Sequence, residues 1–170
     1  MSIHKTKIIF QRMIDVFIVS VKATRKFITK ITGIRRKGFI DYNNIGMSTR
    51  DSILFRDAET CVLKKTKGGL TITGSWKCRY SGKIITNPKD IEIDHIVPIN
   101  YAKNHKIGLW TPASFQEFEN DTDNLIAVSK SLNRAKKDKS LVRWKPPKNH
   151  SWYKKKWTQI CKKWTLENPS

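Results

Sequence analysis

The sequence contains few cysteines, and none of them forms a CxxC pair. The three cysteines are Cys61, Cys78 and Cys161. This spacing excludes a four-cysteine zinc ribbon, and no combination of Cys and His has the spacing of a mixed zinc site. Cys61 and Cys78 flank a predicted hairpin, where they are either two ordinary buried thiols or a disulfide formed in an oxidising compartment. The cysteines therefore predict no structural zinc site.

Acidic residues are also scarce. The 170 residues include 14 Asp and Glu against 34 Lys and Arg, which gives a formal net charge of +20. An excess of this size repels itself in the compact state, so it indicates a polyanionic partner. Nucleic acid is the first candidate, and an anionic membrane surface is the second. The length allows one ordinary domain with a short appendage.

The amino-terminal segment lacks a long uninterrupted hydrophobic run. Apolar residues cover most of a helical wheel drawn for residues 7–31, and the polar residues on one narrow face are Gln11, Asp15, Lys22 and Lys26. This pattern predicts an amphipathic helix. The polar interruptions argue against a secretory signal and a membrane span. We interpret residues 1–35 as an accessory segment, with a signal peptide or membrane-surface anchor as the alternative. We expect a cytoplasmic location, bacterial or phage-encoded, in preference to a secreted or periplasmic one.

The centre of the chain contains an unusual strand, "IEIDHIVPIN", at residues 91–100. Its alternating isoleucines predict a half-buried strand that ends at Pro98, yet Asp94 and His95 lie within it. Burying an acid beside a histidine is costly unless something is bound there. A second apolar strand, "NLIAVS", and a predicted helix, "KSLNRAKKDKS", follow a long polar stretch. Two antiparallel strands packed on one helix would bring Asp94 close to Asn133 on that helix.

Asp94 and Asn133 would then offer two hard oxygen ligands to a divalent ion, and such ligands favour Mg²⁺ or Mn²⁺. His95 would stand beside the ion and take a proton from water, because an imidazole titrates near neutral pH. Glu92 lies on the same strand face as Asp94. It is either a supporting acid behind the ligands or an exposed strand residue.

The motifs "DHIVP", "DN" and "NRAKKDK" together resemble the HNH endonuclease motif of the ββα-metal superfamily. Over residues 40–166 the chain also resembles small bacterial HNH nucleases related to the C-terminal nuclease domain of GmrSD-type restriction enzymes. Residues 1–35 lie outside this resemblance. It implies an α+β fold, with a ββα-metal core plus additional strands and flanking helices. It also implies a metal-dependent endonuclease that hydrolyses phosphodiester bonds in DNA, with RNA as an alternative substrate.

The resemblance implies a role for each motif residue. His95 is the general base, and Asp94 and Asn133 hold the divalent ion, Mg²⁺ or Mn²⁺. Asn124 pins the long loop so that the imidazole points correctly. The chain departs from the family at "NRAKKDK", where the family usually has Gly in place of Ala135 or Lys137.

Basic side chains near the motif and on a predicted C-terminal helix are candidates for phosphate contacts. That helix has one apolar face, formed by Tyr153, Trp157, Ile160, Cys161 and Trp164, with lysines largely elsewhere. The predicted nucleic-acid-binding residues are Arg134, Lys136, Lys154, Lys155, Lys162 and Lys163. Two other functions stay open: a catalytically inactive nucleic-acid-binding module of the same fold, and a cationic membrane-active protein led by residues 1–35.

Overall fold

The computed structural model describes residues 16–20, 48–66 and 69–169. These residues form two compact units. One contains the described residues up to Trp76 together with Thr86–Pro88, and the other contains Lys77–Ile85 and the chain from Lys89 onward. The two units are described separately.

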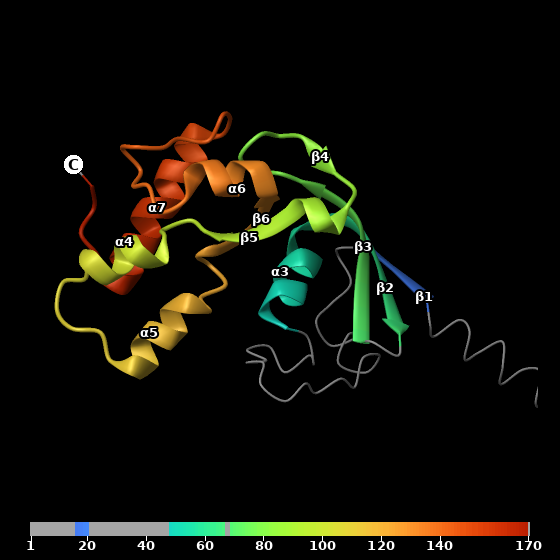
Figure 1. Cartoon of the computed structure of the whole chain (residues 1–170), viewed down its shortest axis with the longest axis horizontal. Helices are drawn as coiled ribbons and strands as arrows, with labels where there is room; N and C mark the ends of the chain where they lie inside the picture. Colours follow the sequence, from blue (N-terminus) through green and yellow to red (C-terminus); the bar gives the residue numbers. More distant parts are fainter. Residues whose placement is uncertain (1–15, 21–47, 67–68, 170) are drawn as a thin grey trace, which may run out of the picture. The chain divides into compact units, whose positions relative to one another are not determined.

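The first unit is a small sheet with one helix (Figure 1). Strands β1 (Val16–Ser20), β2 (Ala58–Thr66) and β3 (Gly69–Lys77) pair antiparallel in that order. Helix α3 (Thr49–Asp57) begins after Ser48, whose side chain accepts a hydrogen bond from the Asp51 amide. Trp76 is buried, and its Nε1 donates to the Leu54 carbonyl at 2.7 Å. The helix is thereby fastened to the third strand.

Strand β1 corrects the prediction of an amino-terminal helix. Val16–Ser20 lies within residues 7–31, and it pairs with β2 instead of forming a helix. The stretch "VFIVS" is rich in β-branched residues, which favour a strand when a partner strand is present. The rest of residues 1–35 lies outside the described residues. Among the described residues, no helix has the length and apolar character to cross a membrane.

The second unit contains two antiparallel strands followed directly by a helix. Strand β5 (Ile91–His95) pairs with β6 (Leu125–Ser129), and Asp94 lies opposite Ile126 in the register. Helix α6 (Lys130–Lys136) begins at the end of β6, where the Ser129 side chain accepts from the Leu132 amide. This ββα arrangement and the mixed small sheets and helices confirm the predicted α+β fold class.

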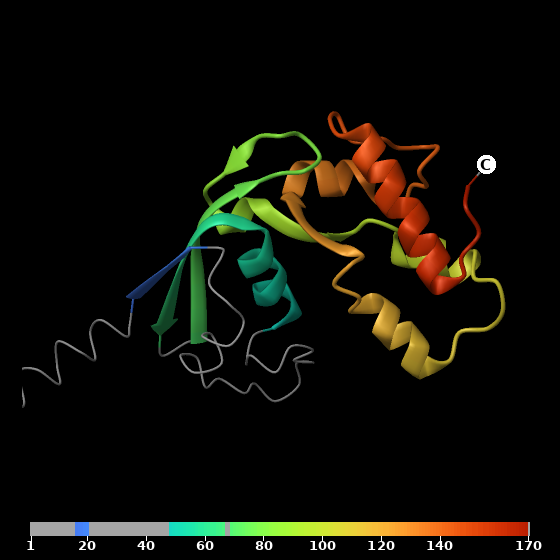
Figure 2. The same ribbon diagram turned by 180° about the vertical axis from the view of Figure 1, so that it is seen from behind.

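Further short elements surround this ββα core. Strand β4 (Ile84–Ile85) and a 3-10 turn (Pro88–Asp90) precede β5. Helices α4 (Ile99–Asn104) and α5 (Pro112–Glu119) occupy the long connection between β5 and β6, and α7 (His150–Trp164) closes the unit. Figure 2 shows α7 along its whole length, close to α6.

Helix α7 buries the apolar face that the sequence predicts. Tyr153, Trp157, Ile160 and Cys161 are all buried on it, in one hydrophobic cluster with residues of β6 and α4. The Tyr153 hydroxyl donates to the Ile96 carbonyl at 3.3 Å, just beyond the end of β5. The core of the unit therefore lies directly behind the strand that carries Asp94 and His95. All three cysteines are buried free thiols.

Candidate active site

Strand β5 and helix α6 face each other with polar side chains. Glu92 and Asp94 lie on one face of β5 because side chains alternate along a strand. Asn133 and Lys136 share one face of α6 because they are three residues apart. The Asn133 side-chain amide donates to Glu92 Oε2 at 3.0 Å, and Lys136 Nζ donates to Asp94 Oδ1 at 2.9 Å. Two polar contacts thus join the strand to the helix.

The Asp94 carboxylate is buried and held at both oxygens. Its exposed fraction is 5%, and its second oxygen accepts a hydrogen bond from the Tyr80 hydroxyl at 2.6 Å. Burial and the neighbouring Asp94 charge raise the pKa of Tyr80 well above its ordinary value, so the phenol stays protonated and keeps donating. Tyr80 belongs to none of the motifs found in the sequence, so its contact with Asp94 is seen in the structure alone.

Lys136 corrects a prediction. The sequence predicts that Lys136, on the helix near the metal ligands, contacts a phosphate, but its exposed fraction is 0%. Its ammonium donates to Asp94 and, at 2.7 Å, to the carbonyl of His95. Burial lowers the pKa of Lys136, and the Asp94 charge offsets part of this. The three-residue spacing from Asn133 was the available signal that Lys136 points toward β5.

His95 is oriented by a main-chain group. Its Nε2 lies 2.8 Å from the carbonyl oxygen of Glu119, at the end of α5. A carbonyl only accepts, so Nε2 carries the hydrogen and Nδ1 keeps its lone pair in the neutral ring. Burial lowers the pKa of His95, although the Glu119 hydrogen bond and the Asp94 charge act in the opposite direction. The imidazole is therefore neutral near pH 7, with Nδ1 available as a base.

Asn124 ties the start of β6 to the residues that follow His95. It is fully buried, its Oδ1 accepts from the Val97 amide at 2.8 Å, and its Nδ2 donates to the Val97 carbonyl at 3.1 Å. Its main-chain carbonyl also accepts from the Ile96 amide at 2.8 Å. These three contacts hold the chain just beyond His95.

The oxygen atoms between β5 and α6 suit a hard divalent ion. Asp94 and Glu92 supply carboxylates, and Asn133 supplies an amide oxygen. A carboxylate offers about four lone-pair sites, and Lys136 and Tyr80 use two of those on Asp94. Within the described ranges, no group of three or more His, Cys, Asp or Glu could hold a metal ion. Glu92, Asp94 and Asn133 offer oxygen donors of the kind that Mg²⁺ and Mn²⁺ prefer.

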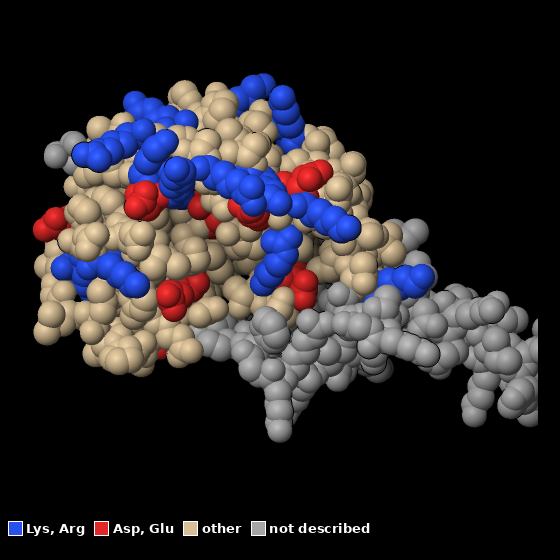
Figure 3. All heavy atoms as spheres, in the orientation of Figure 1, with Lys and Arg blue, Asp and Glu red and all other residues tan. Residues whose placement is uncertain are grey.

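The other predicted phosphate contacts lie on the surface. Arg134 is 67% exposed and forms an ion pair with Glu92 at 3.4 Å. Lys154, Lys155 and Lys162 are exposed on α7. Lys163 is 46% exposed and contacts Asp121 at 2.8 Å. Figure 3 shows Lys and Arg side chains gathered over the part of the face where Figure 1 draws α6 and α7.

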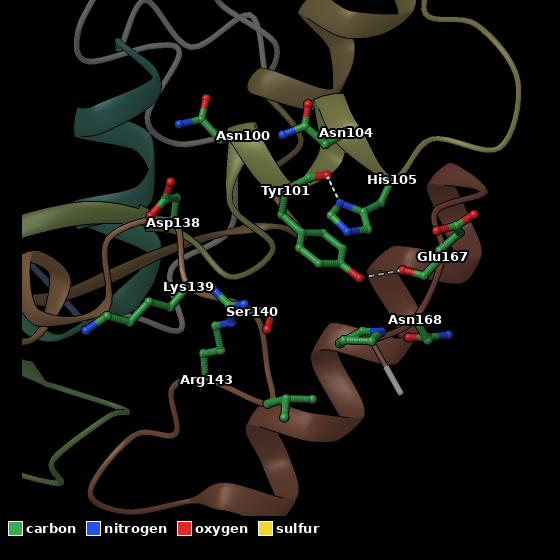
Figure 4. A pocket seen from close by; sticks show the side chains of 12 residues that line it. Asn100, Tyr101, Asn104, His105, Asp138, Lys139, Ser140, Arg143, Glu167 and Asn168 are labelled. Carbon is green, nitrogen blue, oxygen red and sulfur yellow. Dashed lines mark hydrogen bonds between the residues drawn. The ribbon is translucent and has the colours of Figure 1, made fainter.

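A separate pocket of about 630 Å³ lies between α4 and the chain that follows α6 (Figure 4). Lys139 and Arg143 line it together with Asp138 and Glu167, so its charges nearly cancel. His105, whose Nδ1 donates to the Tyr101 carbonyl at 2.9 Å, also lines this pocket. None of the predicted metal ligands lines it. The pocket is therefore distinct from the β5–α6 site and is not strongly cationic.

Comparisons with known proteins place the chain in a family. Residues 48–168 match the family described as the C-terminal domain of GmrSD restriction endonucleases. A protein of Arthroderma benhamiae named "Uncharacterized secreted protein" is 36% identical over 118 residues, which are 66% of this chain and 56% of that protein. The chain thus spans little more than half the length of this relative. No solved structure matches the chain.

The relative also corrects the expected location. The sequence favoured a cytoplasmic protein, whereas the name of the relative describes secretion. The expectation rested on polar residues that interrupt the apolar centre of residues 1–35, and such interruptions are a weak guide to export.

Proposed function

Because the chain belongs to the family of GmrSD restriction endonuclease C-terminal domains, which indicates a nuclease-type function, we propose that it is a metal-dependent HNH endonuclease. Its substrate is DNA, and it hydrolyses phosphodiester bonds with water as the nucleophile. His95 is the general base, and Asp94 and Asn133 hold the divalent ion. Asn124 keeps the segment after His95 in position.

The hydrogen bond between His95 Nε2 and the Glu119 carbonyl carries this proposal. It leaves Nδ1 as the only ring nitrogen with a free lone pair, so Nδ1 accepts a proton from the attacking water. The water oxygen forms a bond to phosphorus, the bond from phosphorus to the leaving sugar oxygen breaks, and the leaving oxygen takes a proton from solvent. A base with a lowered pKa suits this step because it is unprotonated near neutral pH.

Asp94 and Asn133 would hold the divalent ion, and Glu92 would support them through its contact with Asn133. When bound, a Mg²⁺ or Mn²⁺ ion stabilises negative charge on the phosphoryl oxygens and on the leaving oxygen. The oxygen donors of Asp94 and Asn133 support these two ions.

Exposed cations supply the affinity for DNA. Arg134 on α6 and Lys154, Lys155 and Lys162 on α7 are exposed, and Lys163 is partly exposed beside its acidic partners. Each contact between such a cation and a phosphate releases counterions, so binding should weaken steeply as salt rises. The net charge of +20 supports this role. These contacts carry no sequence information, which is consistent with low sequence specificity.

The secretion described for the relative supports export of this chain as well. An exported nuclease would meet nucleic acid outside the cell. Fractionation of the producing cells, with immunodetection of the chain in the medium, tests this part of the proposal.

The direct test is cleavage of supercoiled plasmid with Mg²⁺ or Mn²⁺, with and without EDTA. His95→Ala should lower the rate about 10²–10⁴-fold, because the base is lost while the basic surface remains. His105→Ala is the matched control, since His105 lines the pocket of Figure 4, which none of the proposed catalytic or metal-binding residues lines. Undiminished cleavage by His95→Ala would remove His95 from the mechanism. Salt-sensitive DNA binding without cleavage in either metal would identify an inactive binding module instead.

A further inference from the structure

Lys136 is the most deeply buried charged group of the described chain, and the nuclease chemistry above gives it no step. Its exposed fraction is 0%. Two of the three donors of its ammonium are accounted for, one at Asp94 Oδ1 (2.9 Å) and one at the His95 carbonyl (2.7 Å). A buried ammonium is tolerated only when it is paired and hydrogen-bonded. Each of these two buried charges is therefore stabilised by the other.

We propose that Lys136 is an internal counter-ion for Asp94, which positions this carboxylate before the divalent ion arrives and then competes with the ion for it. The inference rests on the proposed function, because it takes Asp94 as a metal ligand. Lys136 is a positioning residue, and no proton transfer is assigned to it.

The geometry explains why the pair forms. Lys136 is the last residue of α6, and it lies on the same helix face as Asn133. Asp94 is the next residue after Glu92 on the facing side of β5. The contact from Asn133 to Glu92 is half-buried, whereas the contact from Lys136 to Asp94 is closed to water. Of the two acids, Asp94 is thus the one whose charge is neutralised by a cation buried away from water.

The Asp94–Lys136 pair has no net charge. The carboxylate of Asp94 and the ammonium of Lys136 sum to zero, so the metal-free site is not a bare buried anion. A divalent ion on Asp94 would lie a few ångströms from a positive charge held in place by the helix. Like charges at that distance repel strongly in a site with little water. Lys136 therefore keeps the site folded without metal and at the same time weakens its affinity for metal.

The test compares the wild-type chain with Lys136→Met, which keeps most of the side-chain length and removes the charge. Lys139→Met is the matched control, because Lys139 is an exposed lysine whose Nζ donates to the nearby Ala135 carbonyl at 2.8 Å. Calorimetry without DNA measures Mn²⁺ affinity, and thermal unfolding is followed in EDTA and in Mn²⁺. For Lys136→Met we expect a lower unfolding temperature in EDTA, a larger rise on adding Mn²⁺, and Mn²⁺ binding about tenfold tighter or more. Lys139→Met should match the wild type.

Unchanged or weaker Mn²⁺ binding by Lys136→Met would overturn the proposal. A third variant that combines Asp94→Asn with Lys136→Met covers the case in which Lys136→Met does not fold. Removing both charges should restore most of the stability in EDTA, because the cost comes from an unpaired buried charge. A double variant as unstable as Lys136→Met alone would also overturn it. If the wild-type chain neither binds Mn²⁺ nor cuts plasmid, the proposed function fails, and the unfolding series in EDTA still decides whether Lys136 is the counter-ion of Asp94.

Discussion

The second unit contains two Asp–Lys pairs that are alike in length and in sequence separation, and unlike in their access to water. Asp94 and Lys136 lie 2.9 Å apart, and Asp121 and Lys163 lie 2.8 Å apart. The side-chain exposures are 6% and 0% in the first pair, against 5% and 46% in the second. The acid is buried in both, so the lysine makes the difference. When its carboxylate partner is removed, an exposed ammonium is solvated by water, and the fold loses little stability. A buried ammonium is left without solvation or a partner, and the fold loses much more.

The two pairs also support different parts of the site. The inner pair holds the predicted metal ligand on β5. The outer pair holds the connection between α5 and β6, because Asp121 also accepts from Trp164 Nε1 at 2.6 Å and from the Asp123 amide at 3.0 Å. That connection begins at Glu119, whose carbonyl orients His95. One pair thus holds the proposed metal ligand, and the other holds the segment next to the proposed base.

The largest effect is expected from breaking the inner pair. Asp94→Ala should lower the free energy of unfolding by about 3–5 kcal/mol, because it leaves the buried Lys136 ammonium unpaired. It should also weaken Mn²⁺ binding, since a proposed metal ligand is lost. Urea unfolding in EDTA and calorimetry measure the two effects. Asp123→Ala is the control: its carboxylate also contacts a lysine, but it is 65% exposed and should cost about 1 kcal/mol or less. Equal losses in both variants would contradict the comparison.

A smaller effect is expected from breaking the outer pair. Lys163→Met should cost about 1 kcal/mol or less, because the lysine is 46% exposed and water screens its attraction to Asp121. Urea unfolding beside Lys162→Met, an exposed neighbour on α7, separates the loss of the pair from the loss of one surface charge. A loss of several kcal/mol would mean that the outer pair is as enclosed in solution as the inner one.

The pH dependence of the outer pair has a definite sign. Burial acts to lower the pKa of Lys163, but hydrogen bonds to Asp121 and Asp123 outweigh it, and the net pKa is raised above 10.5. A raised lysine pKa stabilises the fold fully below the ordinary value and loses this contribution as pH rises through the folded pKa. The stability difference between wild type and Lys163→Met should therefore be constant up to about pH 10 and shrink above it. A difference that grows in this range would contradict the assignment.

The smallest change in the free energy of unfolding is expected from glycine substitutions at the ends of α6 and α7, the helices that contain Lys136 and Lys163. Lys137, at the end of α6, has φ 54°, and Thr165, at the end of α7, has φ 52°. Residues with a side chain are strained at positive φ, and a β-branched residue is especially so. Lys137→Gly and Thr165→Gly should each raise the free energy of unfolding by about 0.5–1 kcal/mol. Thermal unfolding beside Lys139→Gly, where φ is not positive, measures the gain. Destabilisation by Lys137→Gly would show that its side chain contributes more than its backbone strain costs.

Part of this site follows from local sequence patterns. The alternation in β5, the short apolar run of β6 and the apolar face of α7 each report one element and the side that it buries. The resemblance to HNH nucleases named Asp94, His95, Asn124 and Asn133, and it noted that glycine is usual in place of Ala135 or Lys137. The positive φ of Lys137 supplies a physical reason for that glycine.

The rest depends on contacts between distant segments, which periodicity does not report. Tyr80 reaches Asp94 from a turn before β4, and Glu119 contacts His95 through a main-chain atom, so neither leaves a signature in residue type. Lys136 was predicted to contact a phosphate, because residue type alone does not separate a buried lysine from an exposed one. Strand β1 was mistaken for helix because its partner strand, β2, lies about forty residues further on.

Because the Glu119 group that contacts His95 is a main-chain carbonyl, this contact does not depend on the side chain at position 119. Every residue has the same main-chain carbonyl oxygen, so almost any substitution at residue 119 that keeps the end of α5 helical also keeps the hydrogen bond to His95. A deletion or insertion of one residue in the connection from α5 to β6 would shift that oxygen by about 3 Å or more and release the ring. We therefore expect relatives of this chain to vary in the residue at position 119 and to keep the same number of residues between α5 and Asn124.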